Sequence, residues 1–195
     1  MPVERPDYLP GGYYHVYNRG AHRASLFREE VNYLFVLERM KAYCRALELA
    51  PVAYCLLPNH YHFLIRQDGA HAAGLLPQRV FNSYSKAYNK TYGHSGTLFE
   101  GSYRVRHVTE EGYLMHLCRY IHLNAVLHGL VRDVEGWPYS NYLEWIGERN
   151  GTLVDRRLVA EHFSAVGSYR AFVQEYLCHR QLPSGLEYVR GWERA

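Results

Sequence analysis

The sequence predicts an α+β fold built around an antiparallel sheet, and three observations lead to this prediction. Segments rich in β-forming residues alternate along the chain with segments whose apolar residues recur at helical spacing. Turn residues, such as the pair Pro58-Asn59, separate these segments. The length of 195 residues and the hydrophobic content of 48% are those of one folded domain with a substantial core.

Four segments have the composition and alternation of strands: 13–20, 51–57, 60–67 and 97–108. Gly20 ends the first strand. Pro58-Asn59 joins the second and third strands into a hairpin. Gly101 introduces a bend into the fourth strand.

Three longer segments have helical periodicity: 27–49, 71–92 and 112–130. In the first helix we expect an apolar face made of Val31, Leu34, Phe35, Leu37, Met40 and Leu47. Pro77 is a candidate start of the second helix, and Thr109 resembles an N-cap of the third. The first six elements follow the split βαβ order of a ferredoxin-like fold, which is an antiparallel sheet with two helices on one face.

The C-terminal part of the chain has a different pattern. After an aromatic stretch, two short amphipathic helices are expected over 153–163 and 169–178. We therefore divide the chain into a main domain, residues 1–145, and a helical extension, residues 146–195.

Several protein classes are excluded by missing signals. No apolar run reaches the roughly 18–20 residues of a membrane span, and the start does not resemble a signal peptide, so a cytoplasmic location is expected. The four cysteines form no CxxC motif and are expected to be reduced and buried. The absence of P-loop and GxGxxG motifs predicts no nucleotide cofactor.

His60 and His62 flank Tyr61 on the third predicted strand. Alternation along a strand puts both imidazoles on one face, where they can bind one divalent cation. With 12 histidines in the chain, however, about 0.7 such pairs are expected by chance. Two half-exposed strand histidines are therefore an open alternative.

Tyr120 and Asn124 are four residues apart on the third predicted helix and share one of its faces. His116 extends this row one turn earlier. The same spacing occurs in Tyr14 and Asn18, so the pattern alone is not specific. A solvated helical face is the competing interpretation.

Basic residues gather at the ends of the predicted strands and in the adjoining loops, with tyrosines between them: Arg19, Arg23, Arg66, Arg104 and Arg106, with Tyr17, Tyr61 and Tyr103. Residues 1–108 contain 13 Lys and Arg against 8 Asp and Glu, a net charge of +5. Guanidinium groups beside aromatic rings suit a single-stranded nucleic acid. Ordinary surface arginines at a sheet edge are the alternative.

Four segments in order resemble a known family: YHVYNRGAHRASLF, AYCLLPNHYHFLI, GTLFEGSYRVRHV and YLMHLCRYIHLNAVLHGLV. They resemble the single-tyrosine HUH transposases of the insertion-sequence 200/605 type, above all the REP-associated tyrosine transposases. The resemblance extends over about residues 11–145. The C-terminal tail also resembles the extension of many such proteins.

The resemblance implies a metal-dependent enzyme that cleaves and rejoins single-stranded DNA through a covalent 5′-phosphotyrosine. It implies that His60, His62 and Asn124 hold Mg²⁺ or Mn²⁺ and that Tyr120 is the nucleophile. Single-stranded or hairpin DNA is the implied partner, and the protein is expected to be a monomer or a homodimer. The residues expected to bind the DNA are Arg19, Arg23, Arg104, Arg106 and Tyr103.

The sequence departs from the family pattern at two positions. Ala125 stands where proline is usual, which lets the helix continue past Asn124, and Ser102 stands where a basic residue is frequent. Tyr103 and Tyr113 are local competitors for the role of Tyr120.

Two alternative functions have different chemistry. The first is a hairpin DNA- or RNA-binding protein without catalysis on the same fold. The second is a metal-dependent hydrolase or structural metal protein that adds a third histidine, such as His116 or His122, to the pair.

Overall fold

The computed structural model describes residues 5–163, 166–179 and 184–189. Its centre is a four-stranded antiparallel sheet with the strand order β2-β3-β1-β4. The strands are β1 (Tyr13–Arg19), β2 (Leu49–Leu57), β3 (His60–Gln67) and β4 (Arg104–Val108). With α1 (Glu30–Ala46) between β1 and β2, and α2 (Leu75–Tyr92) between β3 and β4, this confirms the predicted ferredoxin-like order.

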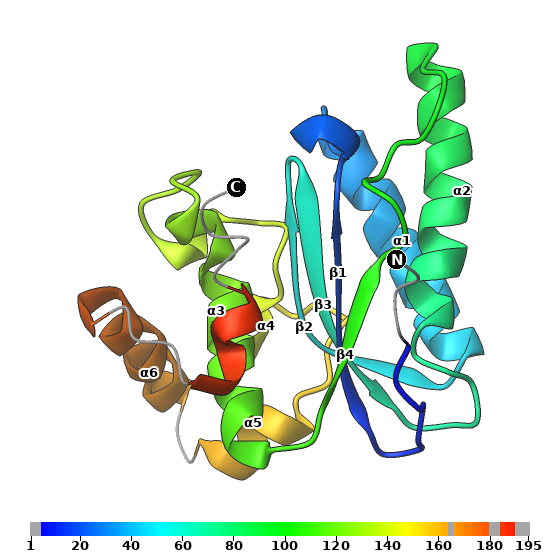
Figure 1. Cartoon of the computed structure of the whole chain (residues 1–195). Coiled ribbons are helices and arrows are strands. Elements are labelled where there is room, and N and C mark those ends of the chain that lie inside the picture. Colours follow the sequence, from blue (N-terminus) through cyan, green and yellow to red (C-terminus); the bar gives the residue numbers. More distant parts are fainter. Residues whose placement is uncertain (1–4, 164–165, 180–183, 190–195) are drawn as a thin grey trace.

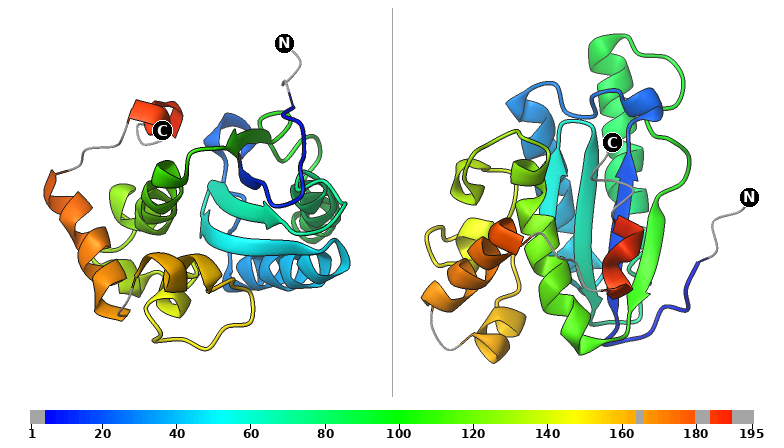
Figure 2. Two further views of the ribbon diagram at one scale, coloured as in Figure 1. Left: turned by 90° about the horizontal axis from the view of Figure 1, so that it is seen from below. Right: turned by 60° about the vertical axis from the view of Figure 1, so that its left-hand side comes forward.

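Helices cover both faces of the sheet (Figure 1). α1 and α2 lie together on one face, and α3 (Glu111–Leu127) lies on the other. The two further views in Figure 2 show the same three layers. Short elements complete the described chain: η1 (Ala21–Arg23), η2 (Val134–Gly136), α4 (Tyr142–Trp145), α5 (Arg157–His162), α6 (Val166–His179) and η3 (Ser184–Val189).

Each face of the sheet has its own apolar core. Alternate residues of β1 and β3, such as Val16 and Phe63, pack against α1 and α2. On the other face, Leu64 packs with residues of α3. Tyr169 and Val173 of α6 belong to this second core, so the residues predicted as an extension pack against the main domain.

The first helix differs from its prediction. It begins at Glu30 because a capping box between Glu29 and Asn32 satisfies the first backbone N–H groups. Val31 and Leu34, which we expected in the apolar face, are 59% and 48% exposed. The side chains that α1 buries are Asn32, Tyr33, Val36, Met40 and Cys44.

The fourth strand is shorter than predicted. Only 104–108 form β4, whereas 97–103 approach the sheet at one bridge, between Phe99 and Gly20. Gly101 adopts a φ of +77°, which turns the chain away from the ladder before β4 begins. The loop 99–103 therefore stands beside the sheet and lines a cavity described below.

Side chains after α3 cover the outer edge of β2. The Trp137 and Trp145 indole N–H groups donate hydrogen bonds to the carbonyls of Leu56 and Val52, at 3.0 and 2.9 Å. The side-chain amide of Asn141 also bonds to this strand: its Oδ1 accepts from the Tyr54 N–H, and its Nδ2 donates to the Val52 carbonyl. These bonds occupy backbone groups at an edge that would otherwise be open to pairing.

His122 is fully buried on α3 and links three segments. Its Nδ1 lies 2.6 Å from the Tyr169 hydroxyl and its Nε2 lies 3.0 Å from Asn141 Oδ1. Burial lowers the pKa of His122 to about 4, while the hydrogen bond that His122 Nε2 donates to Asn141 Oδ1 opposes this shift. This histidine therefore holds the core together in its neutral form.

Acid is expected to destabilise the protein through His122. In the unfolded chain its pKa returns to about 6.5, so between pH 7 and pH 5 the unfolded state gains a proton that the folded state does not. The free energy of unfolding should fall by about 2 kcal/mol from this group alone. Urea denaturation at both pH values should show a loss smaller by that amount in His122→Gln, and equal losses would contradict the prediction.

Three cysteines, Cys44, Cys55 and Cys118, are buried free thiols, as predicted. The side chain of Cys178 lies outside the described residues. Among the helices described, none is long and apolar enough to cross a membrane.

Candidate functional site

His60 and His62 lie on β3 and point to the face of the sheet that α3 covers, together with His15 and Tyr17 of β1. We call this surface the histidine face. The rings of His60 and His62 are 5.4 Å apart between centroids and perpendicular. The residues are only 5% and 0% exposed, so the half-exposed alternative is wrong.

Hydrogen bonds fix the orientation of both rings. The Nδ1 of His60 lies 2.7 Å from Asn59 Oδ1, and because an amide oxygen only accepts, this Nδ1 carries the proton. The Nδ1 of His62 lies 3.0 Å from His15 Nε2, and His15 Nδ1 lies 2.8 Å from the Tyr188 hydroxyl. With Nδ1 as the donor in each of these hydrogen bonds, His60 and His62 both keep the lone pair of Nε2 available.

Burial keeps these histidines neutral. It lowers the pKa of His60 to about 3, with a further decrease from nearby His128, while Asn124 opposes the shift. The pKa of His62 is far below its usual range, again chiefly because of burial and then because of the histidines around it. Neutral imidazole is the form that can coordinate a metal ion, and both histidines are in this form at neutral pH.

Tyr120 and Asn124 are buried on α3 and face the histidines, so the solvated-face interpretation is wrong. The ring of Tyr120 meets that of His62 edge-on, with centroids 5.7 Å apart and planes at 86°. Asn124 donates through Nδ2 to the Tyr120 carbonyl at 2.8 Å. Its Oδ1 is buried and makes no hydrogen bond of regular geometry among the described residues. The amide is nevertheless close enough to His60 to raise the pKa of that histidine.

The donors predicted from the sequence, two imidazoles and one amide oxygen, lie together at this point. No cluster of three His, Cys, Asp or Glu side chains suited to a metal occurs within the described residues. The third histidines considered from the sequence are engaged elsewhere: His122 as above, and His116 at 2.9 Å from Arg119. Two further donors lie next to the pair: the buried Asn124 Oδ1, and the buried Nε2 of His128, whose ring lies 4.7 Å from that of His60.

The predicted DNA-binding residues do not form one cluster. Arg104 and Arg106 lie beside Tyr17 at the histidine face, and Arg106 lies 4.8 Å from the ring centre of Tyr188. Together with Arg5 they line a depression of about 820 Å³ along β4, which we call the basic groove.

The other basic candidates have different surroundings. Arg19 forms an ion pair with Glu100, and Arg23 is exposed in the loop after β1. Arg66, which the sequence grouped with them, is 8% exposed and bound to Asp68 and Asp155, so it is not a surface contact for DNA. Tyr103 lies on the other side of the sheet edge, beneath the guanidinium of Arg5 at 3.9 Å.

The turn η3 lies over the histidine face (Figure 2). Tyr188 contacts His15, Tyr17 and Arg106. The Tyr120 hydroxyl donates to the carbonyl of Val189 at 3.4 Å. The tyrosine is therefore next to the histidines but only 1% exposed.

Sequence reasoning missed two histidines of this site. His128 follows Asn124 by four residues, which extends the row beyond Tyr120, and its ring lies 4.7 Å from that of His60. The same spacing rule that singled out Tyr120 and Asn124 would have found it. His15 is brought to His62 by strand pairing, which needs the sheet register.

A family model described as "Transposase IS200 like" matches residues 9–124, which is more than half of the chain. The chain belongs to this transposase family. A curated protein of Haemophilus influenzae, named as a REP-associated tyrosine transposase, is 30% identical over 122 residues, which cover 55% of this chain and 69% of the relative.

A solved structure has the same fold. It is described as a REP-associated tyrosine transposase bound to a REP hairpin, and it superposes with a TM-score of 0.64 at 18% identity. The match covers 80% of this transposase and 94% of the solved chain.

Proposed function

We propose that this transposase cleaves and rejoins single-stranded DNA, with Tyr120 as nucleophile and with Mg²⁺ or Mn²⁺ held by His60, His62 and Asn124. One observation carries the proposal. The Tyr120 ring meets His62 edge-on at 5.7 Å, and Asn124 lies one turn farther along the same buried helix face. The ring of Tyr120 and the amide of Asn124, both on α3, thus lie beside the two neutral imidazoles of β3, which supports the proposal.

Each side chain has a distinct chemical task. When bound, the divalent cation would neutralise charge on the phosphate that is attacked. The oxygen of Tyr120 forms the new bond to phosphorus, and the bond between phosphorus and the 3′ oxygen of the preceding nucleotide breaks. The phenol proton is lost to solvent, and the departing 3′ oxygen gains one, which leaves a 5′-phosphotyrosine and a free 3′-OH.

Rejoining is the reverse of this step. A 3′-OH attacks the phosphotyrosine, releases the phenol of Tyr120 and restores a phosphodiester without any nucleotide cofactor. The basic groove supports DNA as the partner, since Arg104 and Arg106 lie at the edge from which a strand would approach. A relative with this fold is described as bound to a hairpin, which supports hairpin DNA as the substrate.

End-labelled DNA tests the proposal. The protein is incubated with Mn²⁺ and a hairpin that has single-stranded flanks, and the products are separated on a denaturing gel. A 3′ label should migrate with the protein, and a 5′ label should appear in a shorter free strand. A hydrolase would release both fragments free of protein, and a binding protein would leave the DNA intact, so either result would refute the proposal.

The turn η3 is expected to slow this reaction. Because Tyr188 and Val189 contact His15 and Tyr120, a strand must displace them to reach the phenol. Tyr188→Ala removes the hydroxyl and the ring from this cover and should raise the initial rate of adduct formation about tenfold, equivalent to about 1.4 kcal/mol. Tyr139→Ala is the control, because Tyr139 packs on Tyr33 of α1 on the other side of the sheet. An unchanged or lower rate in Tyr188→Ala would contradict the expectation.

A further inference from the structure

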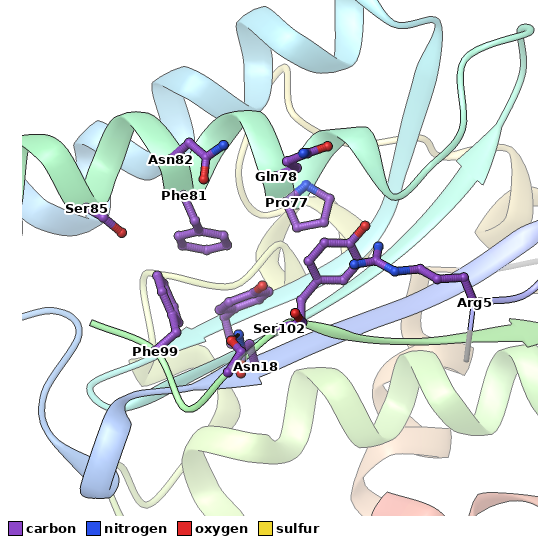
Figure 3. Close-up of a pocket in the computed structure, with 12 residues that line it drawn as sticks. Arg5, Asn18, Pro77, Gln78, Phe81, Asn82, Ser85, Phe99 and Ser102 are labelled. Carbon is purple, nitrogen blue, oxygen red and sulfur yellow. Dashed lines mark hydrogen bonds between the residues drawn. The ribbon is translucent and has the colours of Figure 1, made fainter. Parts of the chain in front are cut away.

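A second cavity lies on the opposite face of β3 from the histidine pair. It has a volume of about 430 Å³, which is in the range of small-ligand pockets. Figure 3 shows α2 on one side of it, with Phe81, Asn82 and Gln78, and the loop residue Phe99 on the other. We call this cavity the aromatic pocket.

Flat rings form the walls of the aromatic pocket. Tyr61 of β3 stacks on Phe81 of α2, with centroids 4.2 Å apart and planes at 25°. Phe99 meets Phe81 at 5.0 Å and 68° and meets Tyr61 almost perpendicularly. Because Tyr61 and Phe81 are buried against each other, the half-buried rings of Phe99 and Tyr103 are the surfaces on which a base can stack, as bases stack on aromatic side chains of single-strand binding proteins.

Neutral polar groups surround the rings. Gln78, Asn82 and Ser85 of α2 line the pocket, and the two amide side chains are exposed. Asn18 supports the opposite wall, because its Nδ2 donates to the Gly101 carbonyl at 3.2 Å. Amides that offer both donors and acceptors can pair with the edge of one base and reject another.

The aromatic pocket connects to the basic groove. Arg5 lines both depressions and covers the ring of Tyr103 at 3.9 Å. Arg104 and Arg106 continue the positive charge from this point to the histidine face. A strand whose phosphates follow these arginines passes around the edge of the sheet at β4.

We propose that the aromatic pocket binds one unpaired nucleobase of the DNA strand and makes the transposase selective for that base. The proposal rests on the proposed function for its partner, which is the single-stranded part of the substrate. Phosphates would lie along Arg5 and Arg104, the base would stack on the open side of Phe99 and Tyr103, and Asn82 and Gln78 would read its edge.

Base preference tests this proposal directly. The full chain binds a pool of DNA hairpins with randomised single-stranded flanks, and the bound fraction is sequenced. The unmodified protein should prefer one base at one flank position by about tenfold, which corresponds to one good amide–base pair. The double variant Gln78→Ala, Asn82→Ala should lose this preference and should keep its affinity for hairpins without flanks.

The variants are chosen to leave the fold intact. Gln78 and Asn82 are exposed, and Thr91→Ala, at an exposed position of the same helix, is the control. A second measurement uses 5-iodouracil in the flank, which should crosslink to Phe99 or Tyr103 at the selective position.

Each outcome bears on a different claim. A protein that forms the adduct but shows no base preference, or keeps it in the double variant, would overturn the pocket proposal alone. A crosslink only to residues outside the pocket would do the same. Base preference that depends on Gln78 and Asn82, without any adduct, would instead overturn the proposed function and support the pocket.

Discussion

Replacement of Tyr120 with Phe is expected to abolish the covalent adduct and to lower DNA cleavage by on the order of 10³-fold or more. The variant removes only the phenol oxygen, which is the proposed nucleophile. The ring remains to pack beside His62 in the core below η3. The hydrogen bond from this oxygen to the Val189 carbonyl is long, at 3.4 Å, so its loss should change the free energy of unfolding little.

Controls for this experiment are the two other tyrosines considered from the sequence. Tyr113→Phe and Tyr103→Phe should retain adduct formation, because Tyr113 lines a separate depression near β4 and Tyr103 lies under Arg5. Hairpin binding by Tyr120→Phe, measured by fluorescence anisotropy, should be unchanged. An adduct that survives in Tyr120→Phe and disappears in Tyr113→Phe would reassign the nucleophile.

Loss of either histidine ligand should remove the metal dependence of the reaction. His62→Asn and His60→Asn each delete one of the two imidazoles proposed to hold the cation, and cleavage should fall by about 100-fold or more at any Mn²⁺ concentration tested. Mn²⁺ binding, followed by electron paramagnetic resonance, should weaken in parallel. DNA affinity should change little, because Arg104 and Arg106 are untouched.

Exposed His71 supplies the matched control, and His71→Gln should have normal cleavage and normal Mn²⁺ binding. Thermal melting verifies that the buried His62→Asn variant is folded. Full Mn²⁺-dependent cleavage in a folded His62→Asn protein would rule out this histidine as a ligand.

Local patterns were sufficient to predict the element order and the histidine pair. The alternation of His60, Tyr61 and His62 gave the face of each side chain, and the spacing of Tyr120 and Asn124 gave one face of α3. Both depend only on the geometry of a single strand or helix. Whether these two faces meet depends on how α3 packs on the sheet. Only the family resemblance implied that packing.

Contacts between distant segments were beyond such patterns. Arg66 pairs with Asp155, and a count of charges cannot distinguish it from the exposed Arg104. Val31 and Leu34 fit a helical stripe, yet α1 is rotated so that it buries Asn32 and Tyr33 instead. The position of η3 over Tyr120 likewise depends on a turn 69 residues farther along the chain.

Three consecutive residues of β3, His60, Tyr61 and His62, serve both faces of the sheet. The odd-numbered side chain contributes to the aromatic pocket, and the even-numbered ones contribute to the proposed metal site. A one-residue slip of β3 against β1 and β2 would exchange the two sides, turning the tyrosine toward α3 and the imidazoles toward α2. A change in the register of β3 would therefore disrupt the aromatic pocket and the proposed metal site at the same time. Neither site can change its register without the other.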